Sequence, residues 1–515
     1  MSESLTHPPR RLWRGSLVGL LAAAATLAVA SCSSKEETPP PVDLPKATGD
    51  VSVQVHEFCG KCHQYPPPET FPRSAWREQV EQGYRFFKES NLAMAAPRLE
   101  DVVTYYEDRA PFELPPARHV RAATPLPVRF SQIRYPAPVK TAPPAISNVN
   151  LVHLFDEKRL DVLACDMRHG LVMVLSPYAK VPEWKVLGKV PHPAHAEVVD
   201  LEKNGKKGIL VANLGSFEPT DDLSGSVVWL RPTGDGKLTP ITLLKDVGRV
   251  ADVQVADFNG DGKLDLVVAV FGWRTTGSIL YLENQTTDWS KPKFVTHVVD
   301  ERHGAIHVPV VPKGLLKTGK ADFIGLISQE HETVVAYLND GRGHFTKKTI
   351  YTAPHPAYGS SGIQLVDVDG RLDILYSNGD ILDKPYLLKP YHRVQWLRNR
   401  GSFPFEREIV TPMYGVHRAV AAGFTGKGKK DIVAVSFLPV EYFPDRETLG
   451  LEAIVLLEQQ ANGGFARHVL EKVTCDHVTC AAGDIFNSGR IDLVVGQFCS
   501  TPSEHAITVW KNEGP

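Results

Sequence analysis

An aspartate followed by apolar residues recurs along the chain, and this repeat constrains the fold more than any other feature. Each copy comes after an apolar stretch and a loop that contains glycine. The seven anchor positions are Asp161, Gly208, Asp265, Asp322, Asp373, Asp431 and Asp492, and they recur at intervals of 47 to 61 residues. Seven strand-rich copies at this period predict an all-β, seven-bladed propeller over residues 128–515.

The last copy indicates how the ring closes. The chain reaches Pro515 directly after the third strand of that copy, so its fourth strand is missing. Residues 128–134 alternate in polarity and precede the first copy, which is typical of a strand without a partner. We expect residues 128–134 to pair with the strand around Thr508 and to cover its exposed edge.

One loop of the repeat carries oxygen ligands at regular spacing. Asp257, Asn259, Asp261 and Asp265 offer side-chain oxygens, and Lys263 offers a backbone carbonyl. This pattern is typical of a Ca²⁺ loop shorter than an EF-hand; the alternative is that the carboxylates only stabilise a tight hairpin. With the repeat around it, the loop resembles the FG-GAP or VCBS repeats of integrin-type propellers over residues 140–515. Loops in the other copies keep fewer oxygens.

A second motif, Cys59-Gly60-Lys61-Cys62-His63, predicts a different cofactor. Two thiols at CxxC spacing can form thioethers to heme, and the adjacent imidazole can ligate the iron, which predicts heme c. A zinc site would need further ligands nearby, yet the next cysteine is Cys165. A bare dithiol or a metal site is the alternative.

Residues 48–112 around this motif predict a small all-α domain. Apolar residues show helical spacing over 76–88 and over 99–109. The region resembles a short class I c-type cytochrome, and the resemblance implies a methionine as the sixth iron ligand. Met94 is the candidate, and the alternative is that Met94 fills the core while another group or none takes the sixth position. Residues 113–127 are predicted to be a linker.

The N-terminus predicts export. Basic residues precede an apolar run over 17–30 that is short for a membrane span, and the run ends in Val29-Ala30-Ser31-Cys32. This end resembles the lipobox of bacterial lipoproteins, which implies a signal peptide over 1–32 and lipidation of Cys32. A plain signal peptide or an uncleaved anchor is the alternative. Residues 33–47 are predicted to be a flexible tether, and the protein to lie in the periplasm or at the cell surface, anchored to a membrane, with the outer membrane favoured.

Composition limits the partners and the disulfides. The chain has 57 Lys plus Arg and 59 Asp plus Glu, a net charge of -2, so nothing in it favours a nucleic-acid partner. In an oxidising compartment disulfides are permitted among the remaining cysteines, and the sequence leaves their pairing open: Cys165, Cys475, Cys480 and Cys499.

The first strand of each copy is predicted to line a central channel. Counting five residues back from each loop places seven residues at the channel mouth: Asn148, His195, Asp252, His307, Gly362, Arg418 and Thr479. His195, Asp252, His307 and Arg418 are the candidates for a catalytic site. Further polar residues fall in loops on or near the same face: His303, His331, His355, His417, His477, Trp273, Arg274, Gln329 and Glu330. Such a gathering could bind a metal, an anionic ligand or an organic cofactor. The alternative is that these polar residues only hydrogen-bond water and strand ends.

Two functions are compatible with these features. In the first, the protein is an exported electron-transfer protein that relays electrons between a substrate or partner at the propeller and a redox chain, as a periplasmic oxidoreductase. In the second, the propeller is a non-enzymatic binding or docking module, stabilised by calcium, that carries a cytochrome. The substrate and the redox partner cannot be named from the sequence.

Overall fold

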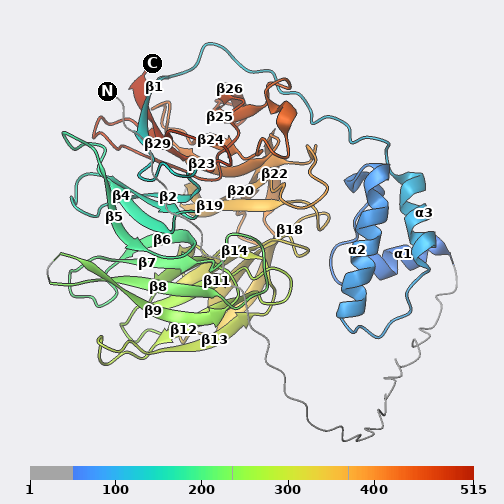
Figure 1. Ribbon diagram of the computed structural model, residues 1–515, viewed down its shortest axis with the longest axis horizontal. Coiled ribbons are helices and arrows are strands. Elements are labelled where there is room, and N and C mark those ends of the chain that lie inside the picture. The colour runs from blue at the N-terminus through green and yellow to red at the C-terminus, as the bar shows by residue number, and fades with distance from the viewer. Residues whose placement is uncertain (1–49, 235, 369) are drawn as a thin grey trace, which may run out of the picture. The chain divides into compact units, whose positions relative to one another are not determined.

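The structure is a computed structural model that describes residues 50–234, 236–368 and 370–515. Seven antiparallel sheets follow one another around a ring, and the colour in Figure 1 runs from teal through green and yellow to red as they do so. Each sheet is one blade of a seven-bladed β-propeller, which confirms the predicted architecture of this part of the chain.

In blades 1 to 6 the strands follow chain order from the inside outward, and in blade 7 the N-terminal strand of the propeller is outermost. Blade 1 consists of β2 (Ile146–Val152), β3 (Asp161–Asp166), β4 (Leu171–Leu175) and β5 (Trp184–Lys189). Blade 2 consists of β6 (Pro193–Val199), β7 (Gly208–Asn213), β8 (Gly225–Pro232) and β9 (Leu238–Val247). Blade 3 consists of β10 (Val250–Ala256), β11 (Asp265–Val270), β12 (Ser278–Asn284) and β13 (Phe294–Asp300). Blade 4 consists of β14 (Ala305–His307), β15 (Val310–Val311), β16 (Asp322–Ile327), β17 (Thr333–Asn339) and β18 (Phe345–Thr352).

The remaining blades repeat this order. Blade 5 consists of β19 (Ser360–Val368), β20 (Arg371–Asn378), β21 (Arg393–Arg398) and β22 (Glu406–Pro412). Blade 6 consists of β23 (Val416–Ala422), β24 (Asp431–Ser436), β25 (Glu452–Gln459) and β26 (Phe465–Lys472), with the 3-10 turn η3 (Pro444–Arg446). Blade 7 consists of β27 (Cys480–Gly483), β28 (Asp492–Gly496), β29 (His505–Gly514) and β1 (Arg129–Pro136).

The second strand of each blade forms the centre of the core. Six of these strands begin at the anchor residue that the repeat identified, and β20 begins two residues before its anchor, Asp373. Every residue of β3, β7 and β11 is buried, because each strand lies between two neighbouring blades. Continuous apolar strands are typical of sheets that are covered on both faces. At one such interface, Trp229 of blade 2 packs in the same cluster as Leu266 and Val268 of blade 3.

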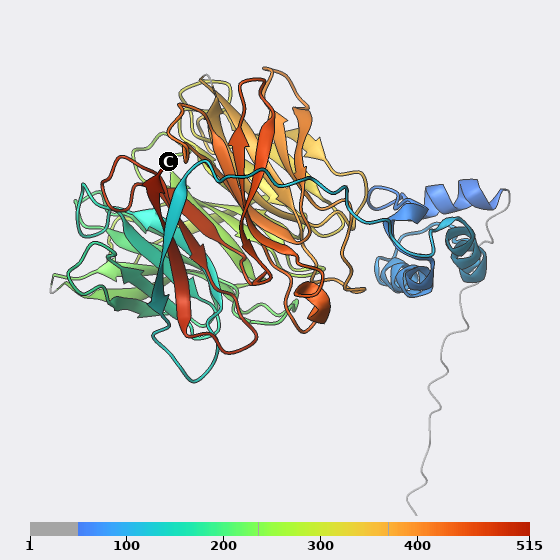
Figure 2. The same cartoon turned by 90° about the horizontal axis from the view of Figure 1, so that it is seen from above.

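The N-terminal strand of the propeller closes the ring. Strand β1 pairs antiparallel with β29, with Arg134 opposite Thr508, and in Figure 2 the cyan β1 lies beside the dark red β29. Tyr135 points into the core of blade 7 and is buried. The last blade therefore combines strands from both ends of the propeller, so that no strand edge is left open at the join.

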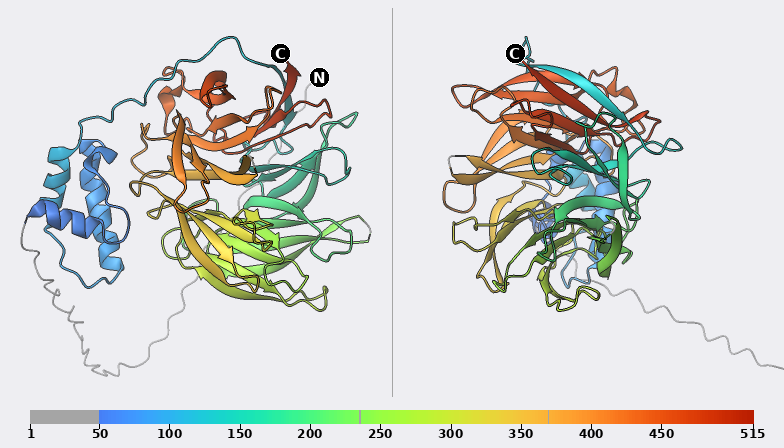
Figure 3. Two further views of the ribbon diagram at one scale, coloured as in Figure 1. Left: turned by 180° about the vertical axis from the view of Figure 1, so that it is seen from behind. Right: turned by 90° about the vertical axis from the view of Figure 1, so that its left-hand side faces the viewer.

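From residue 50 on, three α-helices precede the propeller (blue in Figure 3): α1 (Val51–Cys59), α2 (Trp76–Glu89) and α3 (Leu99–Arg109), with the 3-10 turns η1 (Pro68–Thr70) and η2 (Arg73–Ala75). The helices α2 and α3 match the helical spacing of the sequence. In their core the rings of Trp76 and Tyr106 stack with centroids 3.8 Å apart. Helix α1 was not predicted, although Asp50 caps it by accepting a hydrogen bond from the Ser52 amide.

Candidate functional site

The residues counted to the channel mouth occupy equivalent backbone positions. Six of them directly follow an irregularity in the pairing of the first and second strands of their blades: Asn148, His195, Asp252, His307, Gly362 and Arg418. The seventh, Thr479, lies one residue before β27. Bulges of this kind redirect side chains and occur next to functional sites. The sequence count therefore identified one structurally repeated position.

Four of these side chains, from four blades, form one connected network. His195 Nδ1 pairs with Asp252 Oδ1, and Asp252 Oδ2 lies 3.9 Å from His307 Nδ1. On its other side, His307 Nε2 lies 3.2 Å from a guanidinium nitrogen of Arg418. Asp252 also accepts a hydrogen bond of 2.9 Å from the Val308 amide. The structure thus brings together the four residues that the sequence singled out.

Glu197 extends this network and was missed in the sequence. Its carboxylate lies 2.9 Å from His195 Nε2 and accepts a hydrogen bond of 3.2 Å from Gln254. Glu197 and Gln254 stand two residues after His195 and Asp252 on their strands. Because side chains alternate between the faces of a strand, the residue two positions on points to the same side. That alternation was the signal that could have found them.

Burial and charge set the protonation of the network. Burial acts to lower the pKa of His195, but the Asp252 and Glu197 carboxylates raise it to about 10. Despite its burial, Asp252 has a pKa well below its usual value because of His195 and His307. Burial and the Arg418 cation lower the pKa of His307 to about 4. At neutral pH, His195 and Asp252 are therefore charged and paired, and His307 is neutral. None of these three has a pKa near 7, where a general acid or base works best.

The other histidines near the mouth have separate environments. His417 is buried, which lowers its pKa to about 4, and its Nδ1 lies 3.0 Å from the Val478 carbonyl. His477 pairs with Glu471, and burial lowers the pKa of His355 to about 3. The acceptor Asp221, which the sequence did not suggest, receives hydrogen bonds from the backbone of residues 273–276 and holds that loop.

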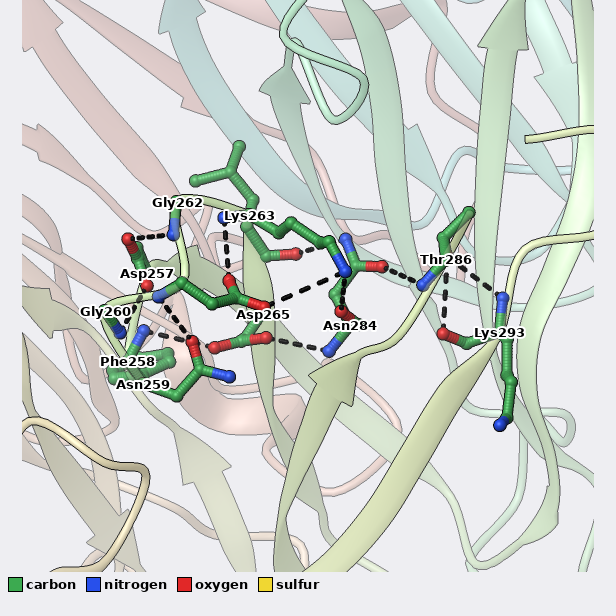
Figure 4. A network of polar contacts seen from close by, with 12 residues as sticks. Asp257, Phe258, Asn259, Gly260, Gly262, Lys263, Asp265, Asn284, Thr286 and Lys293 are labelled. Atoms are coloured by element: carbon green, nitrogen blue, oxygen red, sulfur yellow. Dashed lines mark hydrogen bonds and ion pairs between the residues drawn. The ribbon is translucent and has the colours of Figure 1, made fainter. Parts of the chain in front are cut away.

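The loop from Asp257 to Asp265 joins β10 to β11 and is shown in Figure 4. Asp257 accepts hydrogen bonds from the amides of Gly260 and Gly262, at 2.7 and 2.9 Å. Asn259 accepts from Asp261, and Asp261 accepts from the Lys263 amide. Asp257, Asn259 and Asp261 therefore fold the loop upon itself as a ligand loop does, and each keeps lone pairs that can face a cation.

Asp265 does not join those three side chains. Its oxygens accept hydrogen bonds from the Phe258 amide, the Tyr281 hydroxyl and the Asn284 amide, and it is fully buried. Burial raises its pKa, although these donors lower it in part. In the described part of the chain, the acidic groups of this loop do not form a cluster of three potential ligands. The loop fits a cation through Asp257, Asn259, Asp261 and the Lys263 carbonyl, and Asp265 fits a structural role.

The same role recurs at the start of other second strands. Asp322 accepts from the amides of Leu315 and Asn339, and Asp492 accepts from those of Ile485 and Asn512. In these two blades the aspartate joins the loop before its strand to the end of the third strand. Asp322 has this role although the loop before it has few other oxygens. The recurrence of aspartate at this position of the repeat is therefore explained by its hydrogen bonds within the blade, without a cation.

The CxxCH motif lies at the end of α1. Cys59 is the last residue of the helix, Gly60 caps it, and the free thiols of Cys59 and Cys62 stand three residues apart. At Gly60 a Cβ atom would lie 2.7 Å from the His56 carbonyl oxygen, so a side chain there would force the turn to shift. Burial raises the pKa of Cys59 to about 11. A thiol with a raised pKa is a poor redox nucleophile, which argues against a thioredoxin-like pair.

This donor set fits the attachment of heme. His63 follows Cys62 directly, and helix α3 packs against α1. The buried Tyr106 side chain lies beside Cys59. Met94 is half-buried in the segment between α2 and α3. Cys59, Cys62 and His63 would hold the heme, and Met94 stays a prediction for the sixth iron ligand.

The remaining cysteines are buried and unpaired. Cys165, Cys475, Cys480 and Cys499 are free thiols in the described residues, and burial raises their pKa values. Cys32, the predicted lipidation position, lies outside the described residues, as do the signal peptide over 1–32 and the tether over 33–47. Between residues 50 and 515, no described helix has the length and hydropathy needed to span a bilayer.

Comparisons with known proteins identify the repeat. The family model of the FG-GAP-like repeat matches residues 200–268, which run from the end of blade 2's first strand to the middle of β11. No curated protein matches the sequence. Among solved structures, the chain is similar to BBS1N in complex with ARL6DN, in crystals soaked with lead (11% identity, TM-score 0.44) or mercury (12%, 0.42). Each match covers 74% of this chain and 97% of that chain.

Proposed function

We propose that the propeller is a binding or docking module and that the helices before it carry a covalent heme, so that the protein positions an electron carrier beside a redox partner. The network around Asp252 is the observation that carries the docking part. His195 and Asp252 form a charged pair, Arg418 contacts the neutral His307, and neither histidine has a pKa near neutrality. A network whose polar groups contact one another in this way suits a scaffold.

The chemistry of the CxxCH turn supports the heme. Two free thiols and a histidine stand on one turn at the end of a helix, and Cys59 packs against a small aromatic core. A bound heme would supply one-electron transfer. The chain's own part is to hold the group through Cys59 and Cys62, to ligate the iron through His63, and to limit the access of water through the packing of Trp76 and Tyr106.

Export and membrane attachment belong to the same proposal. Heme attachment to CxxCH and the lipobox-like end at Cys32 are compatible with a lipid-anchored protein of the bacterial periplasm or cell surface. The redox partner is a protein or a small molecule that exchanges electrons with the heme. With a net charge of -2, the whole chain has no strong charge to attract a nucleic acid.

Calcium is proposed as a stabilising ion of the loop between β10 and β11, held by Asp257, Asn259, Asp261 and the Lys263 carbonyl. Chelation of Ca²⁺ is expected to lower the melting temperature of the wild type by roughly 3 °C, because an ion that binds only the folded state stabilises it. The Asp257→Asn variant should no longer respond, whereas Asp288→Asn, in an exposed loop of the same blade, should respond like the wild type. If the wild type melted at the same temperature with and without chelator, the result would contradict the proposed calcium site.

Reduction of the heme separates docking from catalysis. In the docking case, reduction by an artificial donor and by a partner protein proceeds at the same rate in the wild type and in His195→Ala and His307→Ala, since neither side chain takes part in chemistry. Circular dichroism shows whether the variants keep their fold. Small-molecule reduction that is lost in both folded variants would overturn the docking proposal.

The second candidate is a periplasmic oxidoreductase with its active site at the channel mouth. One observation favours it: charged or titratable side chains from four different blades meet at this point. In this case His195, Asp252, His307 and Arg418 bind or activate the substrate, and the heme accepts its electrons. The same pair of variants decides between the two functions.

A further inference from the structure

A second cluster of polar side chains lies in the connections around blade 4. His303 belongs to the link between β13 and β14, and Glu330 and His331 belong to the turn between β16 and β17. One ligand atom from each side chain lies within 4.8 Å of those of the other two. Among the described residues, this is the cluster of histidine and carboxylate groups with the geometry for a metal ion.

The distances suit a single ion between the three side chains. His303 Nε2 lies 2.9 Å from Glu330 Oε2, and His331 Nε2 lies 3.8 Å from Glu330 Oε1. Ligands that bind a zinc ion at about 2.0–2.2 Å lie about 3.4 Å from one another in a tetrahedron. The two distances stand on either side of this value, so small side-chain rotations are enough to reach it.

His331 has an unused ligand atom. Its Nε2 is buried and has no hydrogen-bond partner. A buried polar atom without a partner costs free energy, and in native proteins such atoms often mark an ion or a water.

The backbone holds the two segments against each other. The Ser328 amide donates to the Gly304 carbonyl at 2.8 Å, and a Cβ on Gly304 would lie 2.9 Å from the Ser328 carbonyl oxygen. Gln329 and Glu332 adopt positive φ angles of 56° and 41° on either side of Glu330 and His331. Non-glycine residues in this conformation are strained, and such strain gathers at ligand sites.

Glu332 fixes the far end of the turn. Its buried carboxylate accepts hydrogen bonds of 2.9 and 2.8 Å from the amides of Gly359 and Ser360, at the start of blade 5. The turn that presents Glu330 and His331 is therefore tied to the next blade as well as to Gly304. A ligand set supported in this way is preorganised.

We propose that His303, Glu330 and His331 bind a divalent first-row transition-metal ion, with zinc as the best match. Two imidazoles and one carboxylate suit zinc, iron or copper better than calcium or magnesium, which prefer oxygen ligands alone. Three protein ligands leave one coordination position for water or another ligand. The site is separate from the CxxCH turn and from the loop of Asp257, and it goes beyond the proposed docking function.

Titration of the full-length protein with Zn²⁺ tests the proposal. After chelator treatment, calorimetry should show one tight zinc site per chain. His303→Ala and His331→Ala should each weaken it by at least about 100-fold, since loss of even a supporting residue costs 10–100-fold. The matched control is His297→Ala, because His297 also pairs with a glutamate, Glu283, at 3.3 Å, but without a third ligand. It should bind zinc like the wild type.

Glu330→Gln covers the case in which an alanine variant does not fold, because it keeps the shape of the side chain and removes its charge. This variant should weaken zinc binding by about tenfold or more. X-ray absorption at the zinc edge should show two imidazoles on the bound ion. Wild-type protein without a tight zinc site, or folded His303→Ala and His331→Ala that bind zinc like His297→Ala, would overturn the proposal.

Discussion

Replacement of Asp252 by alanine is expected to lower the free energy of unfolding by about 3–5 kcal/mol, the usual cost of breaking a buried ion pair. The carboxylate is almost fully buried and is shared by His195, His307 and the Val308 amide. Without it, His195 keeps only Glu197, and the Val308 amide loses its acceptor. Urea denaturation at pH 7, followed by tryptophan fluorescence, measures the loss.

Glu197→Ala is the matched control for this experiment. Glu197 contacts the same histidine, but about a third of its side chain is exposed, so its removal should cost no more than about 1 kcal/mol. The test is whether Asp252→Ala lowers the free energy of unfolding more than Glu197→Ala does. If Asp252→Ala were as stable as Glu197→Ala, the network would not hold the inner strands together, and the channel mouth would be free for another role.

Replacement of His63 by alanine is expected to leave the heme attached and to change the ligands and the reduction potential of the iron. Cys59 and Cys62 still form the thioethers, but the iron loses its proximal imidazole. Axial ligands set heme potentials over a range of about 0.8 V, so the reduction potential should shift by on the order of 100 mV. The visible spectrum should change from that of the wild type, and protein-film voltammetry measures the potential.

Met94→Ala is the comparison that tests the sixth ligand. If Met94 ligates the iron, its removal should lower the potential, because a thioether ligand raises it. If Met94 only fills the core, the potential stays unchanged while the melting temperature falls. A His63→Ala protein with the spectrum and the potential of the wild type would show that His63 is not an iron ligand.

The repeat predicted most of the fold. The anchor aspartates mark the start of second strands, and Asp265, Asp322 and Asp492 each join the loop before the strand to the third strand of the blade. The closure of the ring by residues 128–134 was predicted because the last copy of the repeat lacks its fourth strand and residues 128–134 form a strand without a partner in their own part of the sequence. Helix α1 was missed because its nine residues have weak helical periodicity, although Asp50 is a typical N-cap.

Some residues of the candidate sites were predicted from the sequence and others were missed, because only some of them occupy repeated positions. The channel-mouth residues were found because they repeat once per blade, and Glu197 was missed although it follows from strand alternation. Asp265 was predicted as a cation ligand from its spacing, and this stays a prediction; the structure shows that its oxygens also accept hydrogen bonds from Tyr281 and two amides. The same aspartate in the ligand-poor copy at Asp322 was the signal for that role.

The sequence placed His303, Glu330 and His331 in loops near the channel mouth, but their spacing did not predict that the three side chains meet in one cluster. Histidine and glutamate at this separation carry no motif, and the two segments meet only because β14 and β16 are neighbours in one sheet. Close packing of Gly304 against Ser328 then brings the side chains together. Contacts between segments that are paired through the sheet depend on tertiary structure, which a single sequence does not reveal.

Intact-mass and peptide-mass spectrometry of the wild type tests the central claim, that this chain carries a covalent heme. The protein should be produced in a bacterial host that attaches heme to CxxCH motifs. We expect the peptide with Cys59 and Cys62 to carry the mass of one heme and the protein to show a Soret band, both lost in the Cys59→Ala/Cys62→Ala variant. A colourless wild type with an unmodified peptide would contradict the claim.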